Sequence, residues 1–274
     1  MPSPAIIAAN AIAVLAPESF KRAAGKQFVT PRAKKQTDRG RDWLGAQEIA
    51  GFEGAAGEQR AYLAGPEDAP RVFLQHGWEA DSADLSTLGR AVAEAGFRAI
   101  LIDGPAHGGS QGRTASMVSF AEGLARAAYA FGQPYALLAH SMGLPSGVIA
   151  MADHGLNPEA VIGLGAPASL AENVRFQGDG MGLSRRAVGL LLDAVAYRLE
   201  QPVARFAVAN DAPRLSARGL FIHGASDTIA PAQAAGAIAA AWPGAETFIL
   251  DDLGHRGVLR DERVIERALA FLRA

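Results

Sequence analysis

The stretch Tyr135-Ala136-Leu137-Leu138-Ala139-His140-Ser141-Met142-Gly143 predicts how this chain is built. An apolar run typical of a buried strand ends at a serine between small residues, and a helical pattern follows. A strand that turns this sharply into a helix holds Ser141 on a strained corner, with its hydroxyl outside the sheet. The N-terminal N–H groups of the helix face the same point and favour negative charge there. The pentapeptide A-H-S-M-G therefore predicts a nucleophile elbow, with Ala139 in place of the usual glycine.

A serine at such a junction could also be only a helix N-cap, so its partners decide between the two interpretations. A nucleophilic serine needs a base that takes its proton and a third group that orients the base. Two downstream segments, F-I-H-G-A-S-D (221–227) and L-G-H (253–255), each follow a predicted strand and supply Asp227 and His255. Upstream, L-Q-H-G-W (74–78) ends another predicted strand in a His-Gly turn, where a second oxyanion donor is expected.

In the chain order Ser141, Asp227, His255, the sequence resembles the α/β-hydrolase superfamily. The resemblance spans residues 72–255 and rests on the segments L-Q-H-G-W (74–78), L-I-D-G-P-A-H-G-G-S (101–110), A-H-S-M-G (139–143), F-I-H-G-A-S-D (221–227) and L-G-H (253–255). It implies the α/β-hydrolase fold, a mostly parallel central sheet with helices on both faces and a helical cap insertion. Serine esterases and lysophospholipase-like bacterial enzymes are the members that it resembles.

The expected roles follow from position in this fold. Ser141 is the expected nucleophile, and His255 is the expected general base because it alone among the histidines lies between the last predicted strand and the last helix. Asp227 is the expected orienting acid, with Asp251 and Asp252 as rivals that are close to His255 in sequence. The backbone N–H groups of Trp78 and Met142 are the expected oxyanion donors. The histidines set aside are His76, His107, His140, His154 and His223.

Alternation of short apolar segments with helical patterns predicts a mostly parallel sheet covered on both faces. Strands are expected at 72–76, 98–103, 135–139, 160–165, 218–223 and 246–251, with an antiparallel hairpin from 46–52 and 58–64 at the leading edge. Helices are expected at 84–95, 116–131, 142–153, 231–241 and 262–273. Residues 46–167 and 214–274 form the expected core. Residues 168–213 form the expected cap over Ser141, helical at about 183–200, and residues 1–45 form a helical and basic N-terminal segment.

Composition narrows the function classes. The chain has 274 residues, 49% of them hydrophobic, which suits a single large α/β sheet. A formal net charge of −2 gives no reason to expect nucleic acid as a partner. The absence of cysteine excludes disulfides, thiol catalysis and Cys-based zinc sites; it fits a cytoplasmic protein without requiring one. The expected chemistry needs no metal or organic cofactor.

The N-terminal segment leaves two interpretations open. Residues 5–15 are almost wholly apolar. A signal peptide would have Lys or Arg before such a run, and none precedes it here. The run is also shorter than a membrane span. The stretch 21–41 has one acidic residue, Asp38, against eight basic ones: Lys21, Arg22, Lys26, Arg32, Lys34, Lys35, Arg39 and Arg41. Residues 5–41 could dock weakly on an anionic lipid surface. They could also be a packing helix followed by a solvated connector.

The resulting hypothesis is a serine hydrolase that cleaves a small or lipid-like carboxylic ester through an acyl-enzyme. Thioesterase, C–C hydrolase, amidase and cofactor-free haloperoxidase chemistry use the same three residues and remain alternatives. A ligand-binding protein on a hydrolase fold is the non-enzymatic alternative. A haloalkane dehalogenase or epoxide hydrolase would need a carboxylate at position 141. The acyl and alcohol groups and the oligomeric state are not predicted.

Overall fold

The computed structural model describes residues 3–32, 38–54 and 56–274. Its central sheet has eight strands in the order β1-β2-β4-β3-β5-β6-β7-β8. They are β1 (Glu48–Gly54), β2 (Gly57–Ala64), β3 (Arg71–Gln75), β4 (Arg98–Ile102), β5 (Ala136–His140), β6 (Ala160–Leu164), β7 (Arg218–Gly224) and β8 (Glu246–Leu250). Strand β2 is antiparallel to both of its neighbours, and every other pair is parallel. The predicted fold class is confirmed, including the hairpin at the sheet edge.

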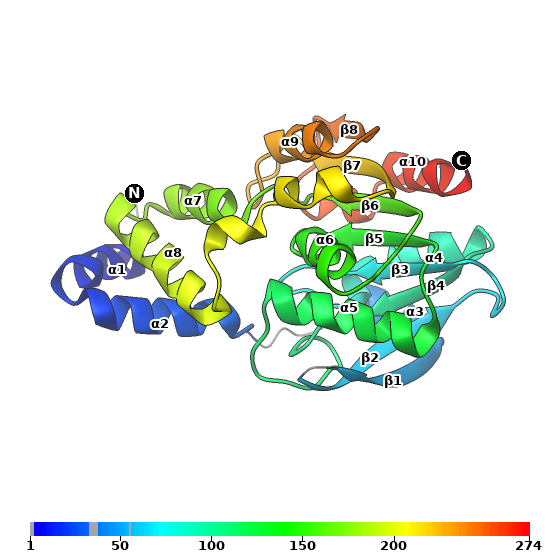
Figure 1. Ribbon diagram of the computed structural model, residues 1–274, viewed down its shortest axis with the longest axis horizontal. Coiled ribbons are helices and arrows are strands. Elements are labelled where there is room, and N and C mark those ends of the chain that lie inside the picture. The colour runs from blue at the N-terminus through cyan, green and yellow to red at the C-terminus, as the bar shows by residue number, and fades with distance from the viewer. Residues whose placement is uncertain (1–2, 33–37, 55) are drawn as a thin grey trace.

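Helices cover both faces of the sheet, as the alternating pattern predicts (Figure 1). On one face lie α3 (Asp38–Gly45), α4 (Ser86–Glu94) and α10 (Glu262–Arg273); on the other lie α5 (Met117–Phe131), α6 (Gly143–Asp153) and α9 (Gln233–Ala241). Strands β5 and β6 are buried along their whole length because helices cover them on both sides. This explains why their sequences are continuous apolar runs rather than alternating ones.

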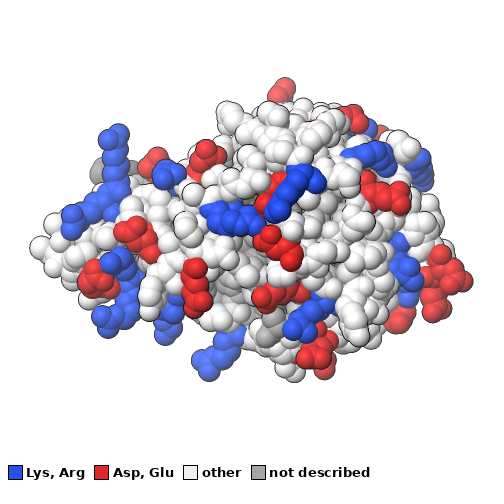
Figure 2. Space-filling view, in the orientation of Figure 1, with Lys and Arg blue, Asp and Glu red and all other residues white. Residues whose placement is uncertain are grey.

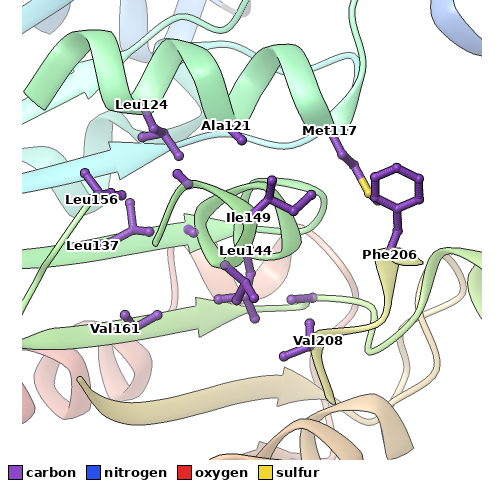
Figure 3. Close-up of a cluster of buried hydrophobic side chains, with 14 of the residues drawn as sticks. Met117, Ala121, Leu124, Leu137, Leu144, Ile149, Leu156, Val161, Phe206 and Val208 are labelled. Carbon is purple, nitrogen blue, oxygen red and sulfur yellow. The ribbon is translucent and has the colours of Figure 1, made fainter. Parts of the chain in front are cut away.

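The core beneath α5 and α6 also anchors the last part of the cap segment (residues 168–213). Leu124 of α5 and Leu144 of α6 pack over Leu137 and Val161 of the sheet (Figure 3). Phe206 and Val208, which precede β7, belong to the same buried cluster, and Figure 3 shows Phe206 beside Met117 at the start of α5.

The cap segment contains α7 (Leu170–Met181) and α8 (Arg185–Leu199), followed by short 3₁₀ turns. Helix α8 confirms the helix predicted at about 183–200. Gly182, with φ of 84°, ends α7 in the left-handed region that glycine adopts without strain. Each helix starts at a serine, Ser169 or Ser184, whose side chain accepts a backbone N–H of the first turn.

The N-terminal helices α1 (Pro4–Leu15) and α2 (Pro17–Val29) pack against α8 rather than against the sheet (Figure 1). Ala13 and Phe20 are buried against Ala187. A Cβ at Gly25 would lie 3.3 Å from the Cβ of Ala194, so glycine here permits a close approach of α2 to α8. No helix in the described ranges is both long enough and apolar enough to cross a membrane. Of the basic residues singled out in the sequence, Lys34 and Lys35 lie outside the described residues.

Candidate active site

Ser141 sits on the sharp turn that its sequence predicts. It directly follows β5, two residues before α6, and its φ is 52°, in the left-handed region that a residue with a Cβ adopts at a cost of about 1–2 kcal/mol. Two backbone hydrogen bonds hold the turn: the Ser141 N–H donates to the Leu164 carbonyl at 2.9 Å, and the Leu144 N–H donates to the Ser141 carbonyl at 3.1 Å. The strain is therefore maintained by the sheet on one side and by the helix on the other.

Two glycines let the loop after β3 cross the turn at close range. A Cβ at Gly77 would lie 2.7 Å from the Cβ of Ser141, and a Cβ at Gly143 would lie 2.7 Å from the Gln75 carbonyl oxygen. A side chain fits at neither position without moving the backbone. Ala139, the departure from the usual motif, is fully buried in the core, so its methyl group is accommodated.

The structure brings together the three side chains that the sequence nominates. The Ser141 Oγ lies 3.1 Å from Nε2 of His255, and the Nδ1 of His255 lies 2.8 Å from Oδ2 of Asp227. A carboxylate accepts only, so the His255 Nδ1–H donates to Asp227 and the Nε2 lone pair faces the serine hydroxyl. The Asp227 side chain is fully buried, and that of His255 is 13% exposed. This arrangement lets the imidazole take a proton from the hydroxyl while the carboxylate holds the ring in orientation.

The Asp227 carboxylate is saturated with donors. Oδ1 accepts the backbone N–H groups of Ile229 at 2.7 Å and Ala230 at 2.9 Å. Oδ2 lies 3.1 Å from Nε2 of His223 as well as close to His255. Burial by itself raises the pKa of Asp227, but the hydrogen bonds from His223, His255 and the backbone outweigh it and hold the pKa well below its usual range. The acid is thus ionised at neutral pH.

The rival acids lie elsewhere. Asp252 is exposed and pairs with Arg263 at 2.9 Å, and the Asp251 side chain is exposed as well. Neither is hydrogen-bonded to His255 among the described contacts, whereas Asp227 is. The structure therefore pairs His255 with the acid that follows the neighbouring strand rather than with those nearest to it in sequence.

His140 contacts the loop that carries His255. Its buried Nε2–H donates to the carbonyl oxygen of His255 at 3.0 Å, and the two rings lie 4.7 Å apart between centroids. Its Nδ1 is buried and has no hydrogen-bond partner among the described residues. Burial, followed by the proximity of His255, lowers the pKa of His140 to about 3, so the ring is neutral. His140 was set aside in the sequence, but its side chain supports the His255 loop, which the sequence did not reveal.

The loop that follows β4 braces the loop that follows β3. The buried carboxylate of Asp103 accepts the N–H groups of Ser82 and Gly109, each at 2.8 Å. His107 donates from Nδ1 to the Pro105 carbonyl and accepts the Glu79 N–H at Nε2, at 3.1 Å. Burial, followed by the proximity of His76, lowers the pKa of His107 to about 4. His107 thus holds the turn next to Trp78.

The predicted oxyanion donors lie on either side of Ser141. Met142 follows it directly, and Trp78 follows Gly77, whose backbone adjoins Ser141. Within the described part of the chain, neither the Trp78 nor the Met142 N–H donates a hydrogen bond to another group. Their role stays a prediction. The Trp78 indole is half-buried and packs edge-on against His107, with centroids 5.2 Å apart.

The remaining histidines do not reach Ser141. His76 is buried and accepts the Gly104 N–H at 2.8 Å, and His154 is exposed at the far end of α6. His223 reaches Asp227 instead; its four-residue spacing from Asp227 across the end of β7 is the one sequence signal that could have suggested this. Across the described residues, no three His, Cys, Asp or Glu side chains form a group that could hold a metal ion.

No protein-family model and no curated protein sequence matches the chain. Solved structures do resemble it. An esterase from Thermogutta terrifontis is 20% identical, with a TM-score of 0.64 over 82% of this chain and 98% of that one. A bromoperoxidase from Bacillus anthracis is 19% identical, with a TM-score of 0.62 over 82% and 99%. A membrane phospholipase A is 16% identical, with a TM-score of 0.64 over 97% and 94%. At these identities the likeness establishes a shared fold.

Proposed function

We propose that this chain, which has the α/β-hydrolase fold, is a serine hydrolase that cleaves a carboxylic ester with Ser141, His255 and Asp227. The observation that carries the proposal is the unbroken hydrogen-bonded path from the Ser141 hydroxyl through His255 to the buried Asp227 carboxylate. The strained φ of Ser141 supports it, because such strain persists where the surrounding structure enforces it and is common at reacting groups.

The reaction follows from this geometry. The Ser141 oxygen attacks the acyl carbon of the ester while Nε2 of His255 takes the hydroxyl proton. The new imidazolium is stabilised by Asp227, and it then protonates the departing alcohol oxygen as the ester C–O bond breaks. A water molecule, deprotonated by the same nitrogen, attacks the acyl-enzyme and releases the carboxylic acid and Ser141.

The carbonyl oxygen gains negative charge in each half-reaction. The unengaged N–H groups of Trp78 and Met142 are the proposed donors to it, and the start of α6 adds a favourable dipole. Each such donor typically lowers the barrier by about 3–4 kcal/mol. The cap segment is proposed to cover this site and to exclude water, with the alcohol and acyl groups between it and the sheet edge.

Other chemistries on the same residues differ in the bond that is broken. A thioesterase, amidase or C–C hydrolase would use the same acyl-enzyme with another leaving group, and a cofactor-free haloperoxidase would use peroxide in place of water. The likeness to the Bacillus anthracis bromoperoxidase makes the last of these worth assaying. A lipid-like ester is as compatible with the fold as a small one, and a cytoplasmic location stays a prediction from the sequence.

The test is hydrolysis of p-nitrophenyl esters from acetate to palmitate by the wild type and by Ser141→Ala. Ser226→Ala is the matched control, because Ser226 is an exposed serine beside Asp227 whose hydroxyl donates to the Asp251 carbonyl. The proposal expects turnover in the wild type and in Ser226→Ala and none above background in Ser141→Ala. Thioester, amide and peroxide–halide substrates are assayed in parallel to separate the alternatives.

If the wild type turns over none of these substrates, labelling of Ser141 by a fluorophosphonate separates a wrong substrate class from a wrong mechanism. Labelling without turnover keeps the nucleophile and rejects the ester panel. Neither labelling nor turnover rejects the hydrolase and favours a ligand-binding protein.

A further inference from the structure

Helix α1 has the usual distribution of side chains reversed. Helical geometry sets one face of α1 toward solvent, and that face is entirely apolar. The exposed fractions are 60% for Ile7, 45% for Ile12, 59% for Val14 and 83% for Leu15. Isolated exposed aliphatic residues are common, but four on one helical face form a contiguous apolar surface, which usually marks a contact with something else.

The polar side chain of α1, Asn10, points inward instead. Its amide nitrogen donates to the Gly182 carbonyl at 3.0 Å and its oxygen accepts the Ser184 N–H at 2.7 Å, at the turn between α7 and α8. The Arg186 side chain adds a hydrogen bond from Nε to the Ala13 carbonyl at 2.9 Å. These contacts fix which side of α1 faces the protein, so the apolar side is held outward by specific hydrogen bonds.

Basic residues outnumber acidic ones in the helices that adjoin this apolar face. Helices α1, α2, α7 and α8 carry seven basic residues against four acidic ones, whereas the whole chain carries 26 against 28. The basic residues are Lys21, Arg22, Lys26, Arg175, Arg185, Arg186 and Arg198, and the acidic ones are Glu18, Glu172, Asp179 and Asp193. Helix α1 itself carries no charge. In Figure 2 the left tip of the molecule, where Figure 1 has α1, is uncharged, and Lys and Arg lie around it together with some Asp and Glu.

We infer that α1 docks on an anionic lipid surface, with its apolar face in the acyl–headgroup boundary and the surrounding Lys and Arg on the lipid phosphates. Its 12 residues span about 18 Å, less than the roughly 30 Å of a bilayer core, so α1 lies along the surface. The apolar face and the basic surroundings then each meet a matching part of the bilayer.

A second copy of the chain fits this surface less well. A two-fold contact through α1 would bury the aliphatic side chains, but it would also gather the same basic residues of both copies around one interface. Lipid phosphates neutralise these charges, and an identical basic surface does not. Charge complementarity therefore favours the lipid.

The docking helix is tied to the candidate site. After α2, the Arg32 guanidinium makes a bidentate pair with the Glu79 carboxylate, with contacts of 2.7 to 3.1 Å. Glu79 follows Trp78, and the same α1–α2 pair packs on α8 of the cap segment. Docking would thus bring the cap segment and the loop after β3 to the lipid. That the site then acts on an ester from this surface rests on the proposed function; the docking itself does not.

Vesicle flotation tests the inference on the full chain. The vesicles are phosphatidylcholine alone or mixed with phosphatidylglycerol, and the α1 variant is Ile7→Ser with Leu15→Ser. The matched control, Ile49→Ser with Ile249→Ser, removes from the sheet edges two isoleucines that are 52% and 42% exposed.

The wild type and the control should float with the anionic vesicles, and the α1 variant should bind at least roughly tenfold more weakly. Lys26→Gln with Arg185→Gln should remove the preference for anionic lipid, and added salt should do the same.

Several results would overturn the docking: no flotation of the wild type, equal binding by the α1 variant, or equal loss in the sheet-edge control. A wild-type dimer in sedimentation velocity that the α1 variant breaks, without vesicle binding, would assign the face to a second copy instead. Circular dichroism establishes that each variant is folded. Hydrolysis of a soluble ester is read separately: if no variant is active but flotation follows the pattern above, the proposed function fails and the docking stands.

Discussion

The carboxyl edge of the sheet and the outer face of α1 depart from the usual distribution of side chains in opposite directions. At the sheet edge, Asp227, His223 and His140 are polar and almost fully buried. On α1, Ile7 and Leu15 are aliphatic and largely exposed. Burial of polar groups and exposure of apolar ones both reduce stability unless something compensates for them.

The compensation differs between the two regions. The Asp227 carboxylate has all its donors within the chain and is linked through His255 to the Ser141 hydroxyl. The face of α1 finds no cover in the described part of the chain, and the inferred lipid surface would supply it. A buried carboxylate that is satisfied within the chain therefore points to chemistry, whereas an uncovered apolar face points to a partner.

The largest expected effect is on the sheet edge. Ser141→Ala should lower kcat for p-nitrophenyl esters by at least about 10⁴-fold, because removal of the nucleophile of such a unit abolishes its joint action. Thermal unfolding should change little, since the mutation removes one oxygen. If Ser141→Ala kept a substantial fraction of wild-type activity, Ser141 would not be the nucleophile that His255 and Asp227 activate.

The second expected effect is a pH dependence of stability. With a folded pKa of about 3 against an unfolded value of 6.5, neutral His140 favours the folded state. The unfolded chain takes up the proton first, so stability is lost as the pH falls below 6.5. By pH 5 this loss should reach about 2 kcal/mol, and His140→Gln should remove it.

Urea unfolding at several pH values measures this loss. His154→Gln is the control, because that histidine is exposed at the end of α6 and should leave the pH dependence as in the wild type. His107, whose pKa is also low, contributes to the change of the unfolding free energy with pH in every variant. An unchanged slope in His140→Gln would show that His140 carries a proton in the folded state, contrary to its buried position.

The sequence predicted the sheet edge well and the α1 face poorly, for physical reasons. Buried parallel strands are apolar on both faces, so each strand end could be located, and Ser141, Asp227 and His255 each follow one. The contact between His223 and Asp227 was missed, because their four-residue spacing is only a weak signal and the contact depends on how the turn after β7 folds back. For α1, a segment whose single polar residue is Asn10 has no polar side to indicate which face is covered. Only the packing against α8 reveals that Asn10 points inward.

A third expected effect concerns His223. His223→Phe removes one of the donors to Asp227 and should lower kcat roughly tenfold, because the carboxylate loses part of its fixed orientation. His223→Gln, which retains an N–H donor, should recover part of the loss. A steady-state comparison of the two variants with the wild type measures this. Equal activity in His223→Phe and the wild type would mean that the backbone N–H groups and His255 are enough to orient Asp227.

The smallest expected effects are on α1, and they separate its two faces. Asn10→Ala should destabilise the protein by about 1–2 kcal/mol, because it leaves the Ser184 N–H and the Gly182 carbonyl without their partner. Ile7→Ser on the opposite face should change stability by less than about 0.5 kcal/mol. Urea unfolding of both variants without lipid gives the two values. The reverse order would mean that the outer face is covered in solution.

Fluorophosphonate labelling followed by peptide mass spectrometry tests the central claim most directly, namely that the buried path through His255 and Asp227 activates Ser141. The account predicts one labelled residue, Ser141, in the wild type, and labelling that is much slower in His255→Gln and Asp227→Asn but unchanged in Ser226→Ala. Absence of label on Ser141, or labelling at the same rate in all four proteins, would contradict it.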